Sequence, residues 1–118
     1  MNVRGIRGAI AVAMTDREAT LAATERLLAE MISRNDLERD DIASIVFTAT
    51  PDLNAAFPAE AARRMGMGAV PLLCAQEIDV RGAMARVVRI LMHVNTDLPP
   101  ADIVHVYLDG AESLRDDL

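Results

Sequence analysis

In three segments of this chain, bulky apolar side chains occupy every second position. This period of two predicts β-strands with one buried face. The segments span residues 3–12, 87–95 and 103–109. Their apolar positions are Ile6, Ile10, Val12, Val88, Ile90, Met92, Val94, Val104, Val106 and Leu108. We expect these positions to face a core that helices cover, which restricts the chain to folds built on a sheet.

The opposite faces of the same strands have an unusual composition for a solvated surface. Their side chains are Arg7, Arg89, His93, His105 and Tyr107, with the apolar Val87 and Leu91 between them. A face of this kind suits burial against another subunit. Arginines at such an interface are costly unless an anion meets them. The residues alone allow two interpretations: a pocket for an anionic ligand, or ion pairs between subunits with Glu77 or Asp79.

The remaining segments predict two helices and two further strands. A helix begins at a capping box of Thr15 and Glu18, carries an outward Glu30–Arg34 pair and ends at Asn35. A strand at 44–50, a short helix at 59–64 and a short strand at 70–74 follow, and residues 76–82 are expected to form a loop. Residues 110–118 are polar, and we expect a loosely held tail. The sum is an α+β fold in which helices cover a sheet.

Composition excludes several classes of protein. The 118 residues, 52% of them hydrophobic, predict a single globular domain over residues 1–118. A net charge of -6 and 3% aromatic residues argue against nucleic-acid and anionic-membrane partners. No apolar run approaches the roughly 20 residues of a membrane helix, and one cysteine excludes an internal disulfide. We therefore expect a cytoplasmic protein.

The side chains that carry most chemistry do not form a recognisable catalytic group in the sequence. His93 and His105 lack metal-ligand spacing, and Glu77 has no paired carboxylate. Cys74 could be an inert buried thiol, a weak donor to a ligand, or a nucleophile if a histidine lies nearby. We expect no metal and no cofactor. All twelve positive side chains are arginines, so a cationic site must use guanidinium groups, whose planar forks match carboxylates.

Several spaced blocks together resemble the AroH-type chorismate mutases. The blocks are RGIRGA at 4–9, ATPDL at 49–53, AFPA at 56–59, VP at 70–71, CAQE at 74–77, DV at 79–80, Arg89, NTD at 95–97, HVYL at 105–108 and LR at 114–115. They occur in order over essentially the whole chain. The resemblance implies a five-stranded mixed β-sheet with helices packed on one face. It also implies a homotrimer that associates through its sheets, with active sites at the subunit interfaces.

The same resemblance implies an isomerase of aromatic amino acid biosynthesis that converts chorismate, a small dicarboxylate, to prephenate without metal or cofactor. It assigns catalytic roles to Arg7, Glu77 and Arg89, with Arg89 donating to the ether oxygen of the substrate. Substrate-binding positions implied in this way are Arg7, Phe57, Arg63, Leu73, Cys74, Ala75, Gln76, Glu77, Arg89, Tyr107 and Arg115. Phe57, Arg63 and Leu73 would come from the adjacent subunit, Cys74 would lie beside Glu77, and Arg115 would help to close the mouth.

Three positions depart from the family pattern. Glu60 stands where a lysine is frequent, Leu73 replaces a polar residue, and Asp116 replaces a proline. The departures at Glu60 and Leu73 keep one alternative open, a trimer that binds a metabolite without catalysis. A second alternative is an imine deaminase of the Rid type, a family that also forms trimers with arginines at the interfaces. The CAQE block at 74–77 fits the mutases better than the deaminases.

Overall fold

The computed structural model describes residues 1–117 and places five strands in one mixed sheet, as predicted. The strands are β1 (Asn2–Ala11), β2 (Ile42–Ala49), β3 (Leu72–Gln76), β4 (Val87–Thr96) and β5 (Val106–Leu108), and the helices are α1 (Arg17–Arg34) and α2 (Ala59–Arg64). Short 3-10 helices occupy Arg39–Asp41, Pro100–Asp102 and Ala111–Asp117. The spatial order is β3-β2-β4-β1-β5. The central β4 is antiparallel to β1 and β2, whereas the two edge strands are parallel to their neighbours.

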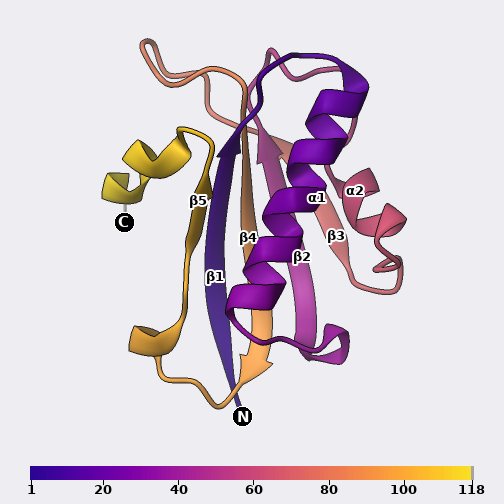
Figure 1. Ribbon diagram of the computed structural model, residues 1–118, viewed down its shortest axis with the longest axis vertical. Helices are drawn as coiled ribbons and strands as arrows, with labels where there is room; N and C mark the ends of the chain where they lie inside the picture. The colour runs from indigo at the N-terminus through magenta and orange to yellow at the C-terminus, as the bar shows by residue number, and fades with distance from the viewer. Residues whose placement is uncertain (118) are drawn as a thin grey trace.

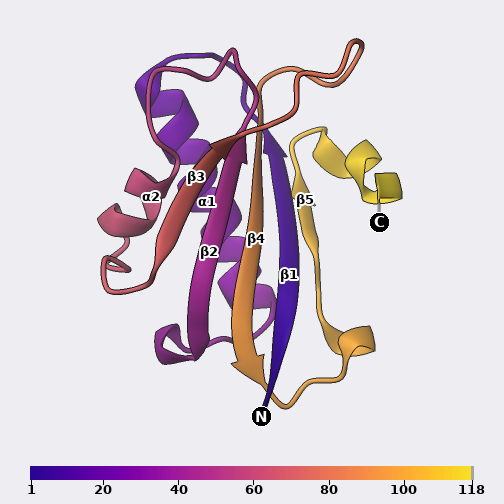
Figure 2. The same cartoon turned by 180° about the vertical axis from the view of Figure 1, so that it is seen from behind.

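The helices lie on one side of the sheet. Helix α1 crosses the front of the sheet in Figure 1, with α2 beside it near β3. From behind, the strands are seen with no helix across them (Figure 2). We call this second side the open face. It carries Val3 and Arg7 of β1 together with Arg89 and Leu91 of β4, because alternate residues of a strand project to the same side.

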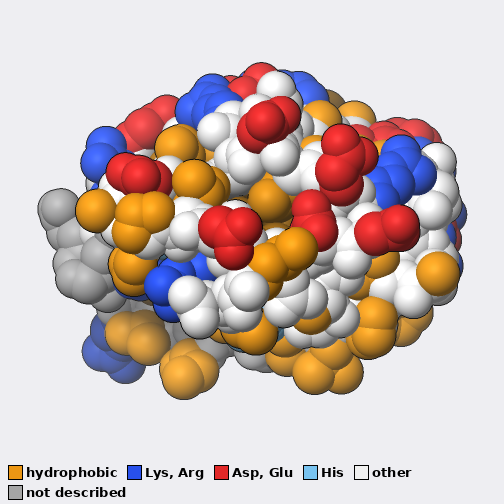
Figure 3. Space-filling model, turned by 90° about the horizontal axis from the view of Figure 1, so that it is seen from below, with side chains coloured by type: hydrophobic (Ala, Val, Ile, Leu, Met, Phe, Trp, Pro, Cys, Tyr) orange, Lys and Arg blue, Asp and Glu red, His pale blue; other side chains and the backbone are white. Residues whose placement is uncertain are grey.

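The core lies between the sheet and α1. The inward residues of β1 and β4 pack against Leu27, Leu28 and Met31 of α1, and all of them are buried. The open face instead leaves Val3, Leu73 and Leu91 exposed. Seen from below, hydrophobic side chains line the lower edge of the molecule, which is the side that Figure 2 faces, and most acidic side chains lie away from that edge (Figure 3). None of the helices among residues 1–117 is long and apolar enough to cross a bilayer.

Helix α1 begins one residue later than its predicted cap. Asp16, not Thr15, is the N-cap residue, and its carboxylate accepts a hydrogen bond from the Ala19 backbone at 3.2 Å. Glu18 does not close a capping box, because it binds Arg64 of α2 at 3.0 Å. An ion pair between the two helices has therefore replaced the predicted capping box. The predicted Glu30–Arg34 pair is confirmed at 2.7 Å.

Strand β5 is much shorter than predicted. Only Val106–Leu108 pair with β1, and Val104, which was expected in the core, is 39% exposed. Side chains take over the hydrogen bonds that a longer strand would have made. The amide of Asn35 bonds both the N–H and the C=O of Val104, at 2.8 and 2.9 Å, and Nδ1 of His105 accepts from the backbone N–H of Arg7 at 2.9 Å.

Strand β3 starts two residues after the predicted boundary. The Val70 N–H closes a turn onto Met67, so pairing with β2 begins at Leu72. Gln76, predicted to lie in a loop, continues the strand opposite Ala49.

The C-terminal tail is packed against the sheet and is not loosely held. Ala111 of the terminal 3-10 helix is fully buried against Ala9 and Val87, with Leu114 beside them. Val87 projects from the open face, and the tail shields this apolar side chain from water. The tail therefore covers one end of the open face and leaves the rest of it uncovered.

Candidate active site

One row of register partners crosses all five strands of the open face. The row runs through Ala75, Thr48, Arg89, Ala9 and Tyr107, from β3 to β5. Partners in a row project from the same face, so the long side chains of Arg89 and Tyr107 flank the methyl group of Ala9. The small residue leaves space between them. Arg7 lies in the neighbouring row, opposite Leu91 of β4.

This space is a hollow of about 260 Å³. Its polar lining comes from Arg7, Thr48, Glu77, Arg89 and Tyr107, and its floor from Gly8, Ala9, Val46, Ile90 and Leu91. Four side chains singled out in the sequence therefore meet in one place, although they come from β1, β4, β5 and the end of β3. A second hollow, of about 650 Å³, shares Glu77 and Arg89 and extends under the loop of residues 77–86.

Glu77 and Arg89 form the charged centre of these hollows. Oε1 of Glu77 lies 3.4 Å from Nε of Arg89, and the two side chains are only 28% and 33% exposed. Oε2 of Glu77 accepts a hydrogen bond from the Thr48 hydroxyl, and the Glu77 backbone N–H donates to Ala49 at 2.9 Å. One interpretation of the sequence was an ion pair between subunits that involves Glu77. The structure shows that Glu77 pairs with Arg89 of the same chain.

Arg7 is held at the opposite end of the first hollow by its backbone. Because Nδ1 of His105 accepts the Arg7 N–H, that nitrogen must be unprotonated. Burial and the nearby Arg7 charge both lower the pKa of His105, which favours the neutral ring that the hydrogen bond needs. The Arg7 side chain itself is exposed and projects from the open face.

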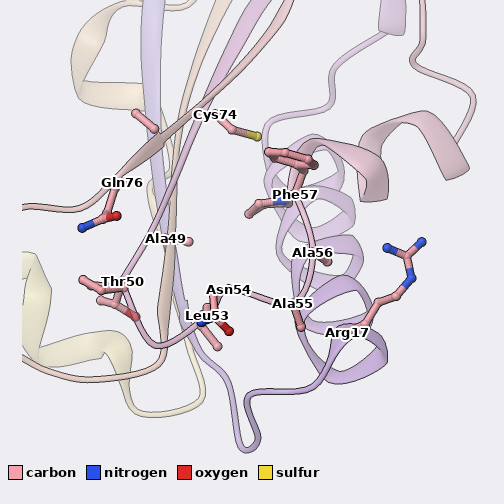
Figure 4. Close-up of a pocket in the computed structure, with 13 residues that line it drawn as sticks. Arg17, Ala49, Thr50, Leu53, Asn54, Ala55, Ala56, Phe57, Cys74 and Gln76 are labelled. Atoms are coloured by element: carbon pink, nitrogen blue, oxygen red, sulfur yellow. The ribbon is translucent and has the colours of Figure 1, made fainter.

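A third hollow, of about 450 Å³, lies at the free edge of β3 (Figure 4). Phe57, Cys74, Ala75 and Gln76 line it together with Arg17, Pro58 and residues 49–51 and 53–56. Phe57 is 72% exposed, and Figure 4 draws its ring and the Cys74 thiol among the side chains that line this hollow. Cys74 pairs in register with the buried Phe47 and so projects to the helical side of the sheet.

The predicted site residues therefore fall into separate groups in one protomer. Cys74 and Glu77 line different hollows of the protomer. Arg63, Leu73 and Arg115 are exposed and line none of the three hollows. Leu73 projects from the open face opposite Val46, Arg63 lies on α2, and Arg115 lies on the terminal 3-10 helix.

One of the departures from the family pattern, Glu60, has its charge balanced locally. Glu60 forms ion pairs with Arg17 and Arg64, so its negative charge is compensated by neighbours. The side chain of Asp116 lies outside the described part of the chain. Among residues 1–117, no group of three or more His, Cys, Asp and Glu side chains is placed to hold a metal ion.

Thr48 is the one polar lining residue of the first hollow that the sequence analysis did not single out. A weak signal exists, because Ser44 and Thr48 are polar whereas Ile45, Phe47 and Ala49 are buried. The alternation of polar and buried residues along this strand does not show which side chain Thr48 contacts.

Comparison with known families decides what this arrangement is. The family model for chorismate mutase type I matches residues 3–118. The chain belongs to this family. Two relatives called chorismate mutase AroH support this: the protein of Thermus thermophilus is 50% identical over 98% of this chain and 96% of its own length, and that of Bacillus subtilis is 43% identical over 100% and 94%. A solved chorismate mutase from Clostridium thermocellum superposes with a TM-score of 0.92 at 51% identity, covering 93% of this chain and 98% of its own.

Membership of the type I chorismate mutases accounts for the blocks of sequence singled out above. The resemblance inferred from those blocks is confirmed by the family match, and the mixed sheet with helices on one face is confirmed by the solved relative.

Proposed function

We propose that this chain converts chorismate to prephenate at the hollow shared by Arg7, Glu77, Arg89 and Tyr107. The observation that carries the proposal is the meeting of these four side chains on the open face of one sheet. Family membership supports the reaction, and the geometry supports the assignment of roles to residues.

The chemistry of the reaction fits the groups that the hollow provides. Chorismate rearranges within one molecule: a C–O ether bond breaks, a C–C bond forms, and no proton is transferred. Catalysis then requires the enzyme to hold the compact conformer and to stabilise the charge that builds on the ether oxygen. Two guanidinium groups, one carboxylate and a phenol provide binding and charge stabilisation without any acid–base pair.

Arg89 is the residue we assign to the ether oxygen. It projects from the central strand β4, next to the methyl group of Ala9, and Oε1 of Glu77 lies 3.4 Å from its Nε. The carboxylate of Glu77 therefore orients the guanidinium group, which makes the donor preorganised. A donor of this kind contributes about 3–4 kcal/mol to transition-state stabilisation.

Arg7 and Tyr107 are assigned to the two ends of the substrate. Arg7 binds a carboxylate, and Tyr107 binds the other end. The net charge of the chain is -6, so the long-range field opposes the approach of a dianion. The pair of arginines must supply the local positive potential that attracts it.

We further propose that the active enzyme is a homotrimer assembled through the open faces. That face exposes Val3, Leu73 and Leu91, and apolar surface of this kind suits contact with another copy. The residues assigned to the site but absent from the first hollow support the same conclusion. A neighbouring copy could bring Phe57, Arg63 and Leu73 against Arg7 and Arg89, with Cys74, Ala75 and Gln76 at the same edge.

The cytoplasmic location and the absence of nucleic-acid and membrane partners remain predictions from the sequence. The Arg115 side chain, on a packed terminal 3-10 helix, is proposed to border the mouth of the site.

Two measurements test the proposal. Purified protein is given chorismate, and prephenate formation is followed: we expect strong acceleration, and tight prephenate binding with no turnover would overturn the catalytic assignment.

Light scattering should give the mass of three 12.8 kDa chains. Leu91→Glu on the open face should lower that mass, whereas Ala29→Glu on the exposed side of α1 should not. A monomeric wild-type protein with full activity would exclude the shared site.

A further inference from the structure

Thr48 occupies the point of the sheet between the two charged groups of the site. It lies on β2, an interior strand, and is the register partner of Arg89 on β4 and of Ala75 on β3. Its hydroxyl donates a hydrogen bond to Oε2 of Glu77. A threonine has a restricted χ1 angle, so a hydroxyl on a paired strand has a well-defined direction.

Glu77 needs such a partner because its own backbone is only partly anchored. It follows the last residue of β3 and begins the loop of residues 77–86. The Glu77 N–H bonds the Ala49 carbonyl at 2.9 Å, which fixes the backbone but leaves the side-chain torsions undetermined.

The two carboxylate oxygens of Glu77 have different partners. Thr48 binds Oε2, and Oε1 lies 3.4 Å from Nε of Arg89. Because the hydroxyl holds one oxygen, rotation of the carboxylate is restricted and the other oxygen stays directed at Arg89. Charge-assisted hydrogen bonds to carboxylates are stronger than neutral ones, which makes this restriction effective.

We propose that Thr48 is a positioning residue for catalysis: its hydroxyl fixes the carboxylate of Glu77, which in turn orients the guanidinium of Arg89. The inference rests on the proposed function, since it deepens the roles given there to Glu77 and Arg89. Thr48 acts through Glu77 and does not itself contact the reacting atoms.

The test removes the hydroxyl while it keeps the shape of the side chain. Thr48→Val should lower kcat about tenfold or more, the loss expected for one hydrogen bond to a charged group, with a much smaller change in KM. Thr48→Ser keeps the hydroxyl and should stay within about threefold of wild type. Thr48→Ala is the second variant if the valine protein folds poorly, and it should show the same fall in kcat.

Ser44→Ala is the matched control. Ser44 lies on the same strand, and its hydroxyl meets His93 at 3.1 Å, away from Glu77. Loss of this hydroxyl should leave kcat unchanged. An equal loss in both variants would show that removal of any hydroxyl from β2 disturbs the site, and it would overturn the proposal.

A double-mutant cycle separates this inference from the proposed function. In a Glu77→Gln background, Thr48→Val should cost little further activity, because the residue that it positions is already altered. A full additional tenfold loss there would show that Thr48 acts independently of Glu77 and would overturn the inference. If Glu77→Gln itself is fully active, the proposed site is wrong; if it is impaired while Thr48→Val is unchanged, only the role of Thr48 fails.

Discussion

Nε of Arg89 lies 3.4 Å from Oε1 of Glu77, although the two residues are distant in sequence and their strands are not neighbours. Arg89 is on the central strand β4, and Glu77 follows the edge strand β3. Strand β2 lies between them and contributes Thr48 to the same contact. The ion pair is two-thirds shielded from water, so it acts in a medium that screens charge less than bulk solvent does. The guanidinium is thereby held in one orientation before a substrate arrives.

Arg89→Lys should lower kcat by a factor on the order of a hundred or more, even though the charge is kept. A lysine ammonium is a compact point charge and cannot present a planar fork to Glu77 and the substrate together. Steady-state kinetics on chorismate checks this. Arg34→Lys, which changes the outward partner of Glu30, is the matched control and should leave kcat unchanged. A value for Arg89→Lys within a few-fold of wild type would contradict the role given to Arg89.

Glu77→Ala should damage catalysis far more than folding. Glu77 lies at the start of a loop and is partly exposed, so its loss removes little packing, whereas Arg89 loses the carboxylate that orients it. Thermal unfolding and chorismate kinetics on the same sample compare the two effects. A large fall in melting temperature together with near-normal kcat would reverse the expected order.

The stability of the protein should fall as His105 becomes protonated. Its pKa in the folded protein lies below the ordinary value of 6.5, mainly because of burial and secondly because of Arg7. The unfolded chain therefore binds this proton at higher pH than the folded one does. The stabilisation is complete above pH 6.5, and it is lost as the pH falls through the lowered pKa of His105 in the folded protein.

His105→Asn provides the control for that pH dependence. The asparagine oxygen lies the same number of bonds from the backbone as Nδ1, so it can still accept the Arg7 N–H, but it does not titrate near neutral pH. Denaturant unfolding at several pH values, from about 8 down to about 5, should show a flatter profile for this variant. Identical profiles for the two proteins would show that His105 does not contribute to the pH dependence.

Gly8→Ala should destabilise the protein by about 1–3 kcal/mol, the usual cost of overpacking. A Cβ at this position would lie 2.5 Å from Sδ of Met31 and 3.2 Å from Cδ1 of Leu27, both in the buried core under α1. Gly68→Ala is the matched control, since nothing lies within 4 Å of its Cβ. Urea unfolding measures both free energies of unfolding. A neutral Gly8→Ala variant would show that the core can rearrange to accept a methyl group.

Much of the sheet could be predicted because alternation is a local property. Arg7 and Arg89 were placed on the outward faces of their strands from the sequence alone, and the inward residues of β1 and β4 are buried as expected. The predictions failed where a distant side chain replaced a local partner. Glu18 binds Arg64 instead of closing a capping box, and Asn35 binds the backbone of Val104 where a longer β5 was predicted.

The sequence by itself determined which residues of β1 and β4 face the core, which face the opposite side, and to which family the pattern belongs, because strand period and spaced motifs are properties of neighbouring positions. Only the tertiary structure decided that Thr48, Glu77 and Arg89 form one contact and that Ala111 covers Val87. Such contacts depend on strand order and register, and these are set by the packing of the whole chain. Thr48 is 29 positions from Glu77 and 41 positions from Arg89 in the sequence. These residues become neighbours only when the sheet has formed.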